Sequence, residues 1–295
     1  MLHRILVPLD GSGEAESILP YLRDLAPRFS SHVDILGVGI GRKNRRVNRL
    51  LEEYIGRVAV SLQSNSIKAE AVTLYGSAAD KILDYAAQND IDLIIMATHG
   101  RSGITRWWMG SVAEKVISEA STPVLLVQSK HPTKTGTVRK LPFLKILTPL
   151  DGSDIGQAAL PYAEALATKT GASINLLQVL SPPGALEASI LGGPDWRKFV
   201  KAMHDGGEDY LSSIAKKLDE KGIKTTCEVV TGDPAGRIVE YAEDKEVSLI
   251  AMSTHGRTGI SRWVLGSVAD KVLHGARMPM LLVRSPKMII PRPTT

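Results

Sequence analysis

Cysteine and long apolar runs are scarce in this chain, and each absence excludes a class of protein. Cys227 is the single cysteine among 295 residues, which excludes an intramolecular disulfide and is compatible with a reducing compartment. No apolar run approaches the roughly 20 residues that a membrane-spanning helix needs. The first predicted strand begins almost at Met1, with Ile5, and no h-region or cleavage site of a signal peptide precedes it. We therefore expect a cytoplasmic protein in which Cys227 packs as an inert thiol in a strand.

Several signatures of enzymes and cofactor sites are also missing. No segment matches G-x-x-x-x-G-K-[ST], which disfavours a P-loop NTPase. Gly11-Ser-Gly13 begins like a dinucleotide fingerprint, but Glu16 stands where the third glycine belongs, which disfavours a dinucleotide oxidoreductase. No nucleophile and orienting carboxylate occur at motif spacing, and no Cys/His cluster is present. We therefore expect neither a catalytic residue nor a transition-metal site.

The excess of positive charge is small and local. Lys and Arg outnumber Asp and Glu by 36 to 31, which gives a net charge of +5. Much of the excess lies in Gly41-Arg-Lys-Asn-Arg-Arg46 with Arg49, where no aromatic residue interleaves with the basic ones. Such a cluster can steer nucleic acid or an acidic partner, but no nucleic-acid motif surrounds it. We expect a solvated loop and helix start.

What the chain does contain is an internal repeat. Ile5-Leu-Val-Pro-Leu-Asp-Gly-Ser12 returns as Ile146-Leu-Thr-Pro-Leu-Asp-Gly-Ser153. A second match is longer, since 14 of 19 positions are identical between Thr98–Val116 and Thr254–Val272, in a Gly-rich stretch. Core packing does not require a repeated loop, so the chain is predicted to hold two tandem domains whose loops serve a function.

Each half alternates short β-branched runs with longer stretches of helical period, which predicts an α/β fold with a parallel sheet. First-half strands are expected at 4–9, 33–38, 68–74, 93–97 and 124–127. Helices are expected between them at 14–29, 47–64, 77–88 and 111–120. Second-half strands are expected at 145–150, 173–179, 225–230, 249–253 and 280–283.

The repeats also predict the domain boundaries. The first domain is expected at 1–130 and the second at 143–286, with a linker at 131–142 and a tail at 287–295. The second repeat gains residues within 181–205, where Pro-Pro and Gly-Gly-Pro indicate irregular chain. This insertion is either a lid or a longer connection.

An aspartate follows the first strand of each half. In an open parallel sheet, ligands bind beyond the carboxyl ends of the strands, near the switch in strand order. Asp10 and Asp151 come at that position, where a carboxylate can accept hydrogen bonds from a ribose hydroxyl. An Asp-Gly-Ser turn can equally serve structure, through side-chain bonds to the backbone at a helix start. Both interpretations stand on the sequence alone.

The Gly-rich loop predicts a phosphate site. Gly100 is followed after nine residues by Gly110-Ser111 and a helix, and Gly256 with Gly266-Ser267 repeats that spacing. Glycine lets the backbone approach an anion closely, and a helix N-terminus offers N–H donors and partial positive charge. A phosphate chain is the expected ligand.

The loop also has structural interpretations. Ser111-x-x-Glu114 matches a capping box, and Ser267-x-x-Asp270 approximates one. Capping explains the serine but neither the glycines nor the arginines of the loop, which are Arg101, Arg106, Arg257 and Arg262. These arginines either reach phosphate oxygens or are exposed. We expect His99 and His255 to structure the loop rather than to catalyse.

Together these motifs resemble the universal stress protein family over almost the whole of both halves. The matching segments are the Ile-Leu-x-Pro-Leu-Asp-Gly-Ser opening, the Thr-His-Gly-Arg loop, Gly-x9-Gly-Ser and the final Pro-x-Leu-Leu-Val strand. The resemblance implies two tandem Rossmann-like domains, each a five-stranded parallel sheet in the order 3-2-1-4-5 flanked by helices. For one branch of the family, it also implies ATP bound at G-x-x-G-x9-G-[ST].

Carried over to this sequence, the resemblance implies a nucleotide site in each half. Asp10 and Asp151 would hold ribose, and backbone near Val38 and Val179 would recognise adenine. The phosphates, assisted by Mg²⁺, would meet Gly100, Gly110, Ser111 and Val112 in one half, and Gly256, Gly266, Ser267 and Val268 in the other. The neighbours included in the site are Pro8, Leu9, Met96, Ala97, His99, Arg101, Pro149, Leu150, Met252, Ser253, His255 and Arg257.

One position departs from the family's motif, whose first glycine is Ala97 here and Ser253 in the second half. An added Cβ is tolerated where φ is negative, so we expect weaker or altered binding rather than none. Family members also pair through their last strands. The resemblance therefore implies that Val124–Val127 meets Met280–Val283 in an internal pseudo-dimer, and that two chains can form a homodimer.

The first functional hypothesis is a nucleotide-binding stress-response or regulatory protein, with ATP in one or both repeats and at most slow hydrolysis. The alternative is a non-nucleotide module that contacts protein partners, in which the Gly-rich loop is structural. A third hypothesis is an enzyme acting on a nucleotide, with the insertion at 181–205 as its lid.

Overall fold

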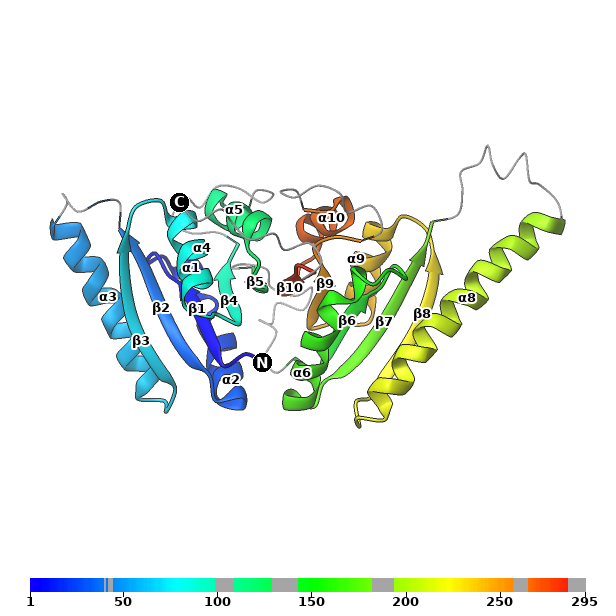
Figure 1. Cartoon of the computed structure of the whole chain (residues 1–295), viewed down its shortest axis with the longest axis horizontal. Helices are drawn as coiled ribbons and strands as arrows, with labels where there is room; N and C mark the ends of the chain where they lie inside the picture. The colour runs from blue at the N-terminus through cyan, green and yellow to red at the C-terminus, as the bar shows by residue number, and fades with distance from the viewer. Residues whose placement is uncertain are drawn as a thin grey trace. The chain divides into compact units, whose positions relative to one another are not determined.

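The computed structural model describes residues 1–39, 41, 45–98, 109–128, 143–181, 194–256 and 265–285 (Figure 1). The chain divides into two compact units. Unit 1 takes its described residues from Met1–Pro142, Leu265 and 277–285, and unit 2 from Phe143–Ile260 and Gly266–Ala276. The predicted linker at 131–142 and tail at 287–295 lie outside the described residues.

The strands of unit 1 form a parallel sheet with one antiparallel member. They are β1 Arg4–Pro8, β2 His32–Gly39, β3 Lys68–Tyr75, β4 Leu93–Ala97, β5 Val124–Val127 and β10 Met280–Val283. Hydrogen-bonded neighbours follow the order β3-β2-β1-β4-β5-β10, and β10 runs antiparallel to β5 with Leu281 opposite Leu125. Every residue of β4 and β5 is buried, as expected of parallel strands that are covered on both faces.

The helices of unit 1 fill the gaps between its strands. They are α1 Gly13–Glu16, α2 Leu19–Phe29, α3 Arg45–Gln63, α4 Ala78–Gln88 and α5 Ser111–Glu119. The prediction of one helix at 14–29 is wrong, because the segment breaks at 17–18 and Pro20 lies in the first turn of α2. Proline has no N–H to donate, so the first turn of a helix accommodates it without losing a backbone hydrogen bond.

Unit 2 has a parallel sheet of four strands, connected in the same order as the first four strands of unit 1. Its strands β6 Lys145–Pro149, β7 Ser173–Leu180, β8 Thr225–Thr231 and β9 Leu249–Ser253 pair in parallel in the order β9-β6-β7-β8. Its helices are η1 Gly156–Ala159, α6 Leu160–Thr170, α8 Pro194–Asp219, α9 Pro234–Asp244 and α10 Ser267–Gly275. The predicted α/β fold with a parallel sheet and flanking helices is therefore confirmed in both units.

The insertion of the second repeat is partly helical. Residues 194–205 belong to α8, which packs on β7 and β8, so the prediction of irregular chain is wrong there (Figure 1). Residues 182–193 lie outside the described part of the chain. Helix α8 continues through Gly207, where the helix packs closely against the sheet. A Cβ at this position would lie 2.8 Å from Gln178 Oε1 and 3.2 Å from Val229 Cγ1. Within the described ranges, no helix is both long and apolar enough to cross a membrane.

The free cysteine is exposed, contrary to the expectation of a packed thiol. Cys227 lies on β8, which ends the unit 2 sheet among the strands that the structure describes. Alternation along a strand indicates which residues share a face, but it does not show which strand ends the sheet.

Alkylation of Cys227 by iodoacetamide at pH 8 is expected to be slower than alkylation of free cysteine, despite this exposure. Desolvation raises the pKa of the thiol, and the negative charge of Asp219 raises it further. A raised pKa leaves less of the reactive thiolate at pH 8, and the rate should climb as the pH rises through that pKa. Mass spectrometry of timed samples measures the rate. A rate equal to that of free cysteine would contradict the prediction, and Asp219→Asn should accelerate the reaction slightly.

Candidate functional site

The repeated Asp-Gly-Ser segment continues directly from the first strand of each unit. Leu9 N donates to Leu36 O at 2.9 Å, and Leu150 N donates to Leu177 O at 2.8 Å, so strand pairing extends one residue beyond β1 and β6. Asp10 and Asp151 follow these pairs at the carboxyl ends of their strands and are partly exposed. In unit 1, β1 lies between β2 and β4, which is the point where the strand order reverses.

In both units one carboxylate oxygen of the aspartate holds the turn that follows. Asp10 Oδ1 accepts hydrogen bonds from the Ser12 backbone N at 2.9 Å and from Ser12 Oγ at 2.6 Å. Asp151 Oδ1 accepts the equivalent bonds from Ser153 at 3.0 and 2.7 Å. Each serine then accepts from the first turn of the next helix, Ser12 from Ala15 N at 3.1 Å and Ser153 from Gly156 N at 3.0 Å. The structural interpretation of the turn is therefore confirmed, through the Oδ1 atom of each aspartate.

The second oxygen of Asp151 lies against the Gly-rich loop. A Cβ placed on Gly256 would collide with Asp151 Oδ2, and a Cβ placed on Gly156 would collide with Oδ1. Gly256 and Gly156 do not have a positive φ, so these positions need glycine for space rather than for backbone conformation. The fold therefore brings together Asp151 and Gly256, two residues that the sequence analysis assigned to one nucleotide site.

Gly156 was not among the predicted site residues. It occupies the position of Ala15 in the first repeat, and both residues donate their backbone N–H to the serine of the turn. A single replacement of alanine by glycine between the repeats is a weak signal, and only the contact with Asp151 shows its purpose.

A hydrogen bond closes the base of the Gly-rich loop in each unit. Gly110 N donates to Thr98 O at 2.9 Å, and Gly266 N donates to Thr254 O at 2.8 Å. A Cβ on Gly266 would lie 2.8 Å from Thr254 O, which is backbone and cannot move aside easily. Both loops therefore return to the strand end from which they leave, and the following helix starts there.

The capping-box interpretation of the two serines is wrong. Gly110 and Gly266 are the N-cap residues, and Ser111 and Ser267 are the first helical residues, with exposed side chains. In a capping box, the acidic side chain accepts a hydrogen bond from the backbone N–H of the N-cap residue. Here the N–H groups of Gly110 and Gly266 donate to Thr98 O and Thr254 O instead. The first backbone bonds of the helices are Glu114 N to Gly110 O at 3.0 Å and Asp270 N to Gly266 O at 2.9 Å.

The start of each helix is consequently suited to an anion. The N–H groups of the three residues after the N-cap have no acceptor within the helix, and no side chain of the N-cap residue covers them. Such donors, together with the partial positive charge at a helix N-terminus, are suited to phosphate or carboxylate. Val112 and Val268, the second residues of the helices, are half-buried.

The two residues that replace the motif's first glycine cause no backbone strain. Ala97 and Ser253 are both buried and neither has a positive φ, which is the condition under which an added Cβ is tolerated. Ser253 Oγ accepts from His255 N at 3.4 Å. His255 is itself buried, and its Nδ1 lies 2.9 Å from Thr254 Oγ1. These contacts favour the expected loop-structuring role of His255.

The remaining predicted site residues surround the strand ends. Val38 and Val179 are partly exposed near the ends of β2 and β7, opposite Leu74 and Val230. Four predicted residues, Leu9, Leu150, Met96 and Met252, are buried, while Pro8 and Pro149 are half-buried. Buried side chains leave only backbone for a ligand. His99, Gly100, Arg101 and Arg257 lie outside the described residues.

Comparison with known proteins identifies the family. The family model described as "Universal stress protein family" matches residues 42–128 and 142–284, well over half of the chain. Universal stress protein MJ0531 of Methanocaldococcus jannaschii is 36% identical over 147 residues, which cover 49% of this chain and 84% of that protein. Universal stress protein Slr1230 of Synechocystis is 22% identical over 315 residues and matches 96% of this chain and 100% of its own length. A solved universal stress protein from Archaeoglobus fulgidus shares the fold, with a TM-score of 0.71 at 20% identity over 96% of this chain and 99% of that one. The chain therefore belongs to the universal stress protein family.

Proposed function

We propose that the chain is a stress-response regulator that binds an adenine nucleotide, as Mg-ATP, in one or both repeats. One observation carries the proposal. In both units the Gly-rich loop closes on itself through the N-cap glycine, at 2.9 Å to Thr98 O and at 2.8 Å to Thr254 O, and this places the donors of α5 and α10 at the strand end. Backbone donors at a helix N-terminus, beside the point where the strand order reverses, suit the phosphates of a nucleotide.

The residues around this helix start are assigned the following roles in the proposal. Asp10 and Asp151 accept from ribose at the carboxyl ends of β1 and β6, and the position of Asp151 beside Gly256 supports this assignment. Backbone near Val38 and Val179 contacts adenine. Two groups hold the phosphates, Gly100, Gly110, Ser111 and Val112 in one repeat and Gly256, Gly266, Ser267 and Val268 in the other, with Mg²⁺ offsetting the phosphate charge.

The proposal includes at most slow hydrolysis. His255 is buried and its Nδ1 is engaged with Thr254, which supports a structural role rather than service as a general base. We also propose that the last strands of the repeats pair as an internal pseudo-dimer, which the antiparallel register of β5 and β10 supports. Homodimer formation and a cytoplasmic location remain predictions.

Calorimetric titration of nucleotide-stripped protein with Mg-ATP tests the proposed function. We expect saturable binding of one or two nucleotides per chain, with AMP and GTP binding more weakly because they lack the full phosphate chain or the adenine. Two sites would show that both repeats are competent, and one site that they have diverged. Absence of binding at millimolar Mg-ATP would contradict the proposal and leave the partner-contacting module as the function to test.

A further inference from the structure

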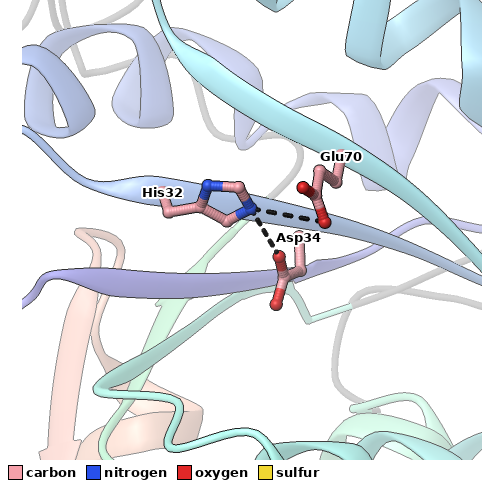
Figure 2. A group of neighbouring side chains, drawn as sticks. All are labelled: His32, Asp34 and Glu70. Carbon is pink, nitrogen blue, oxygen red and sulfur yellow. Dashed lines mark ion pairs between the residues drawn. The ribbon is translucent and has the colours of Figure 1, made fainter.

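A second cluster of chemically reactive side chains lies in unit 1, at the opposite ends of the strands from the candidate nucleotide site. It consists of His32 and Asp34 on β2 and Glu70 on β3 (Figure 2). His32 and Asp34 are two residues apart, so they lie on the same face of the strand. Glu70 is the direct partner of Asp34 in the parallel register. The three side chains are therefore held together by strand pairing.

The ligand atoms of this cluster have the spacing of a metal site. His32 Nε2 lies 3.3 Å from Asp34 Oδ1 and 3.6 Å from Glu70 Oε2, and all three atoms lie within 4.8 Å of one another. Figure 2 shows both carboxylates on the Nε2 side of the imidazole. A tetrahedral zinc ion with bonds of about 2.0–2.2 Å separates neighbouring ligand atoms by about 3.4 Å. The two distances from His32 Nε2 are therefore close to the separation that such an ion requires.

Asp34 is the residue that points to a bound cation. Its side chain is 0% exposed, and its Oδ1 has no hydrogen-bond partner although it lies beside His32. Its Oδ2 accepts from Arg4 Nε at 2.8 Å and from Tyr85 Oη at 3.2 Å. Those two bonds fix the carboxylate, as outer-shell partners fix the ligands of metal sites. A buried carboxylate oxygen without a hydrogen bond is unfavourable, and a metal ion would satisfy it.

The local charge and exposure permit an ion to enter. With a neutral imidazole, the charges of Arg4, Asp34 and Glu70 sum to −1, so a divalent cation meets no net repulsion. The side chains of His32 and Glu70 are 33% and 64% exposed, which leaves a path to solvent and room for a water ligand. Zinc accepts both imidazole and carboxylate ligands, and the imidazole favours zinc and neighbouring transition metals over Mg²⁺ and Ca²⁺.

We propose that His32, Asp34 and Glu70 form a divalent transition-metal site, best suited to zinc, with water completing the coordination. Such an ion links β2 to β3 at the end of the sheet remote from the helix starts of α5. The site belongs to unit 1 alone, because the equivalent positions in unit 2 are Ser173, Asn175 and Thr226, with Asn175 opposite Thr226 in the register. One metal per chain is therefore expected, and its binding is independent of nucleotide.

Zinc titration of EDTA-treated protein against a chelating dye tests the site. We expect one zinc per chain, and a tetrahedral absorption spectrum when Co²⁺ replaces zinc. His32→Gln should weaken zinc binding at least about 100-fold and Glu70→Gln about 10-fold, since loss of an outer-shell partner alone typically costs 10–100-fold. Both residues reach solvent, so both variants should fold, and circular dichroism checks this.

A matched control comes from the other group of ligand-type side chains among the described residues. His204, Asp205 and Glu208 lie on the surface of α8, where the side chain of Asp205 is 54% exposed and pairs with Lys201, so no buried carboxylate oxygen needs a cation. His204→Gln should leave zinc affinity unchanged. Absence of zinc uptake at micromolar concentration would overturn the proposal, because His32 would then serve only as an ion-pair partner of Asp34. Uptake that survives His32→Gln and disappears in His204→Gln would overturn it as well.

Discussion

The Ser111→Glu/Ser267→Glu double variant is expected to lose Mg-ATP affinity at least about 100-fold while remaining folded. Both serines are exposed first residues of their helices, beside the proposed phosphates. Two like charges about 4 Å apart repel by about 4 kcal/mol at an effective dielectric constant of 20, and about 1.4 kcal/mol corresponds to a tenfold change in Kd. The same carboxylate stabilises the helix by about 0.3–1 kcal/mol, because it faces the positive end of the macrodipole.

Calorimetric titration and thermal melting of the same samples separate the two effects. Ser111→Gln/Ser267→Gln is the matched control, since it adds similar volume without charge and should retain much of the affinity. The single Glu variants show which repeat binds. Replacement of Gly266 is a poorer test, because a Cβ there meets Thr254 O and disturbs the base of the loop. A folded Glu double variant with unchanged affinity would remove the helix starts from the proposed site.

Arg4→Met is expected to lower the stability of unit 1 by about 3 kcal/mol, since removing one partner of a buried ion pair leaves an uncompensated charge. Asp34 is fully buried, whereas the Arg4 side chain is 35% exposed and its Nε donates to Asp34 Oδ2 at 2.8 Å. The hydrogen bond to Asp34 raises the pKa of Arg4, so the guanidinium stays charged. Desolvation and the charge of Asp34 raise the pKa of Tyr85, so the phenol remains a donor. Tyr85 alone does not neutralise the carboxylate.

Native-state hydrogen exchange at the amides of β2, in EDTA, measures this loss locally. Arg28→Met is the matched control, because the carboxylate of its partner Asp24, at 2.9 Å, is 19% exposed rather than fully buried, and the loss should be about 1 kcal/mol or less. Arg4→Met/Asp34→Asn should recover most of the stability. Unit 2 shows that a neutral pair fits, since Asn175 Nδ2 lies 3.3 Å from Tyr241 Oη. Equal losses for Arg4→Met and Arg28→Met would contradict the prediction.

Strand positions were predictable because parallel strands buried on both faces appear as short apolar runs between turn signals. All ten predicted strands exist, and their ends differ from the observed ones by one residue at most. The helices were less well predicted where a single residue decides the boundary. Pro20 divides 14–29 into α1 and α2, while Pro194 opens α8 within a stretch that its Gly-Gly-Pro had indicated as irregular.

The sequence by itself determined the tandem repeat, the α/β class, the aspartate after each first strand and the Gly-x9-Gly spacing, because these depend on local patterns that two halves repeat. Only the tertiary structure decided which of those residues meet. Closure of the loop on Thr98 and Thr254 makes glycine the N-cap and leaves the serines exposed. Packing of Gly256 against Asp151 joins segments far apart in the chain. The register of β2 and β3 places Glu70 beside Asp34, which no spacing along the sequence encodes, since strand pairing depends on contacts between separate segments.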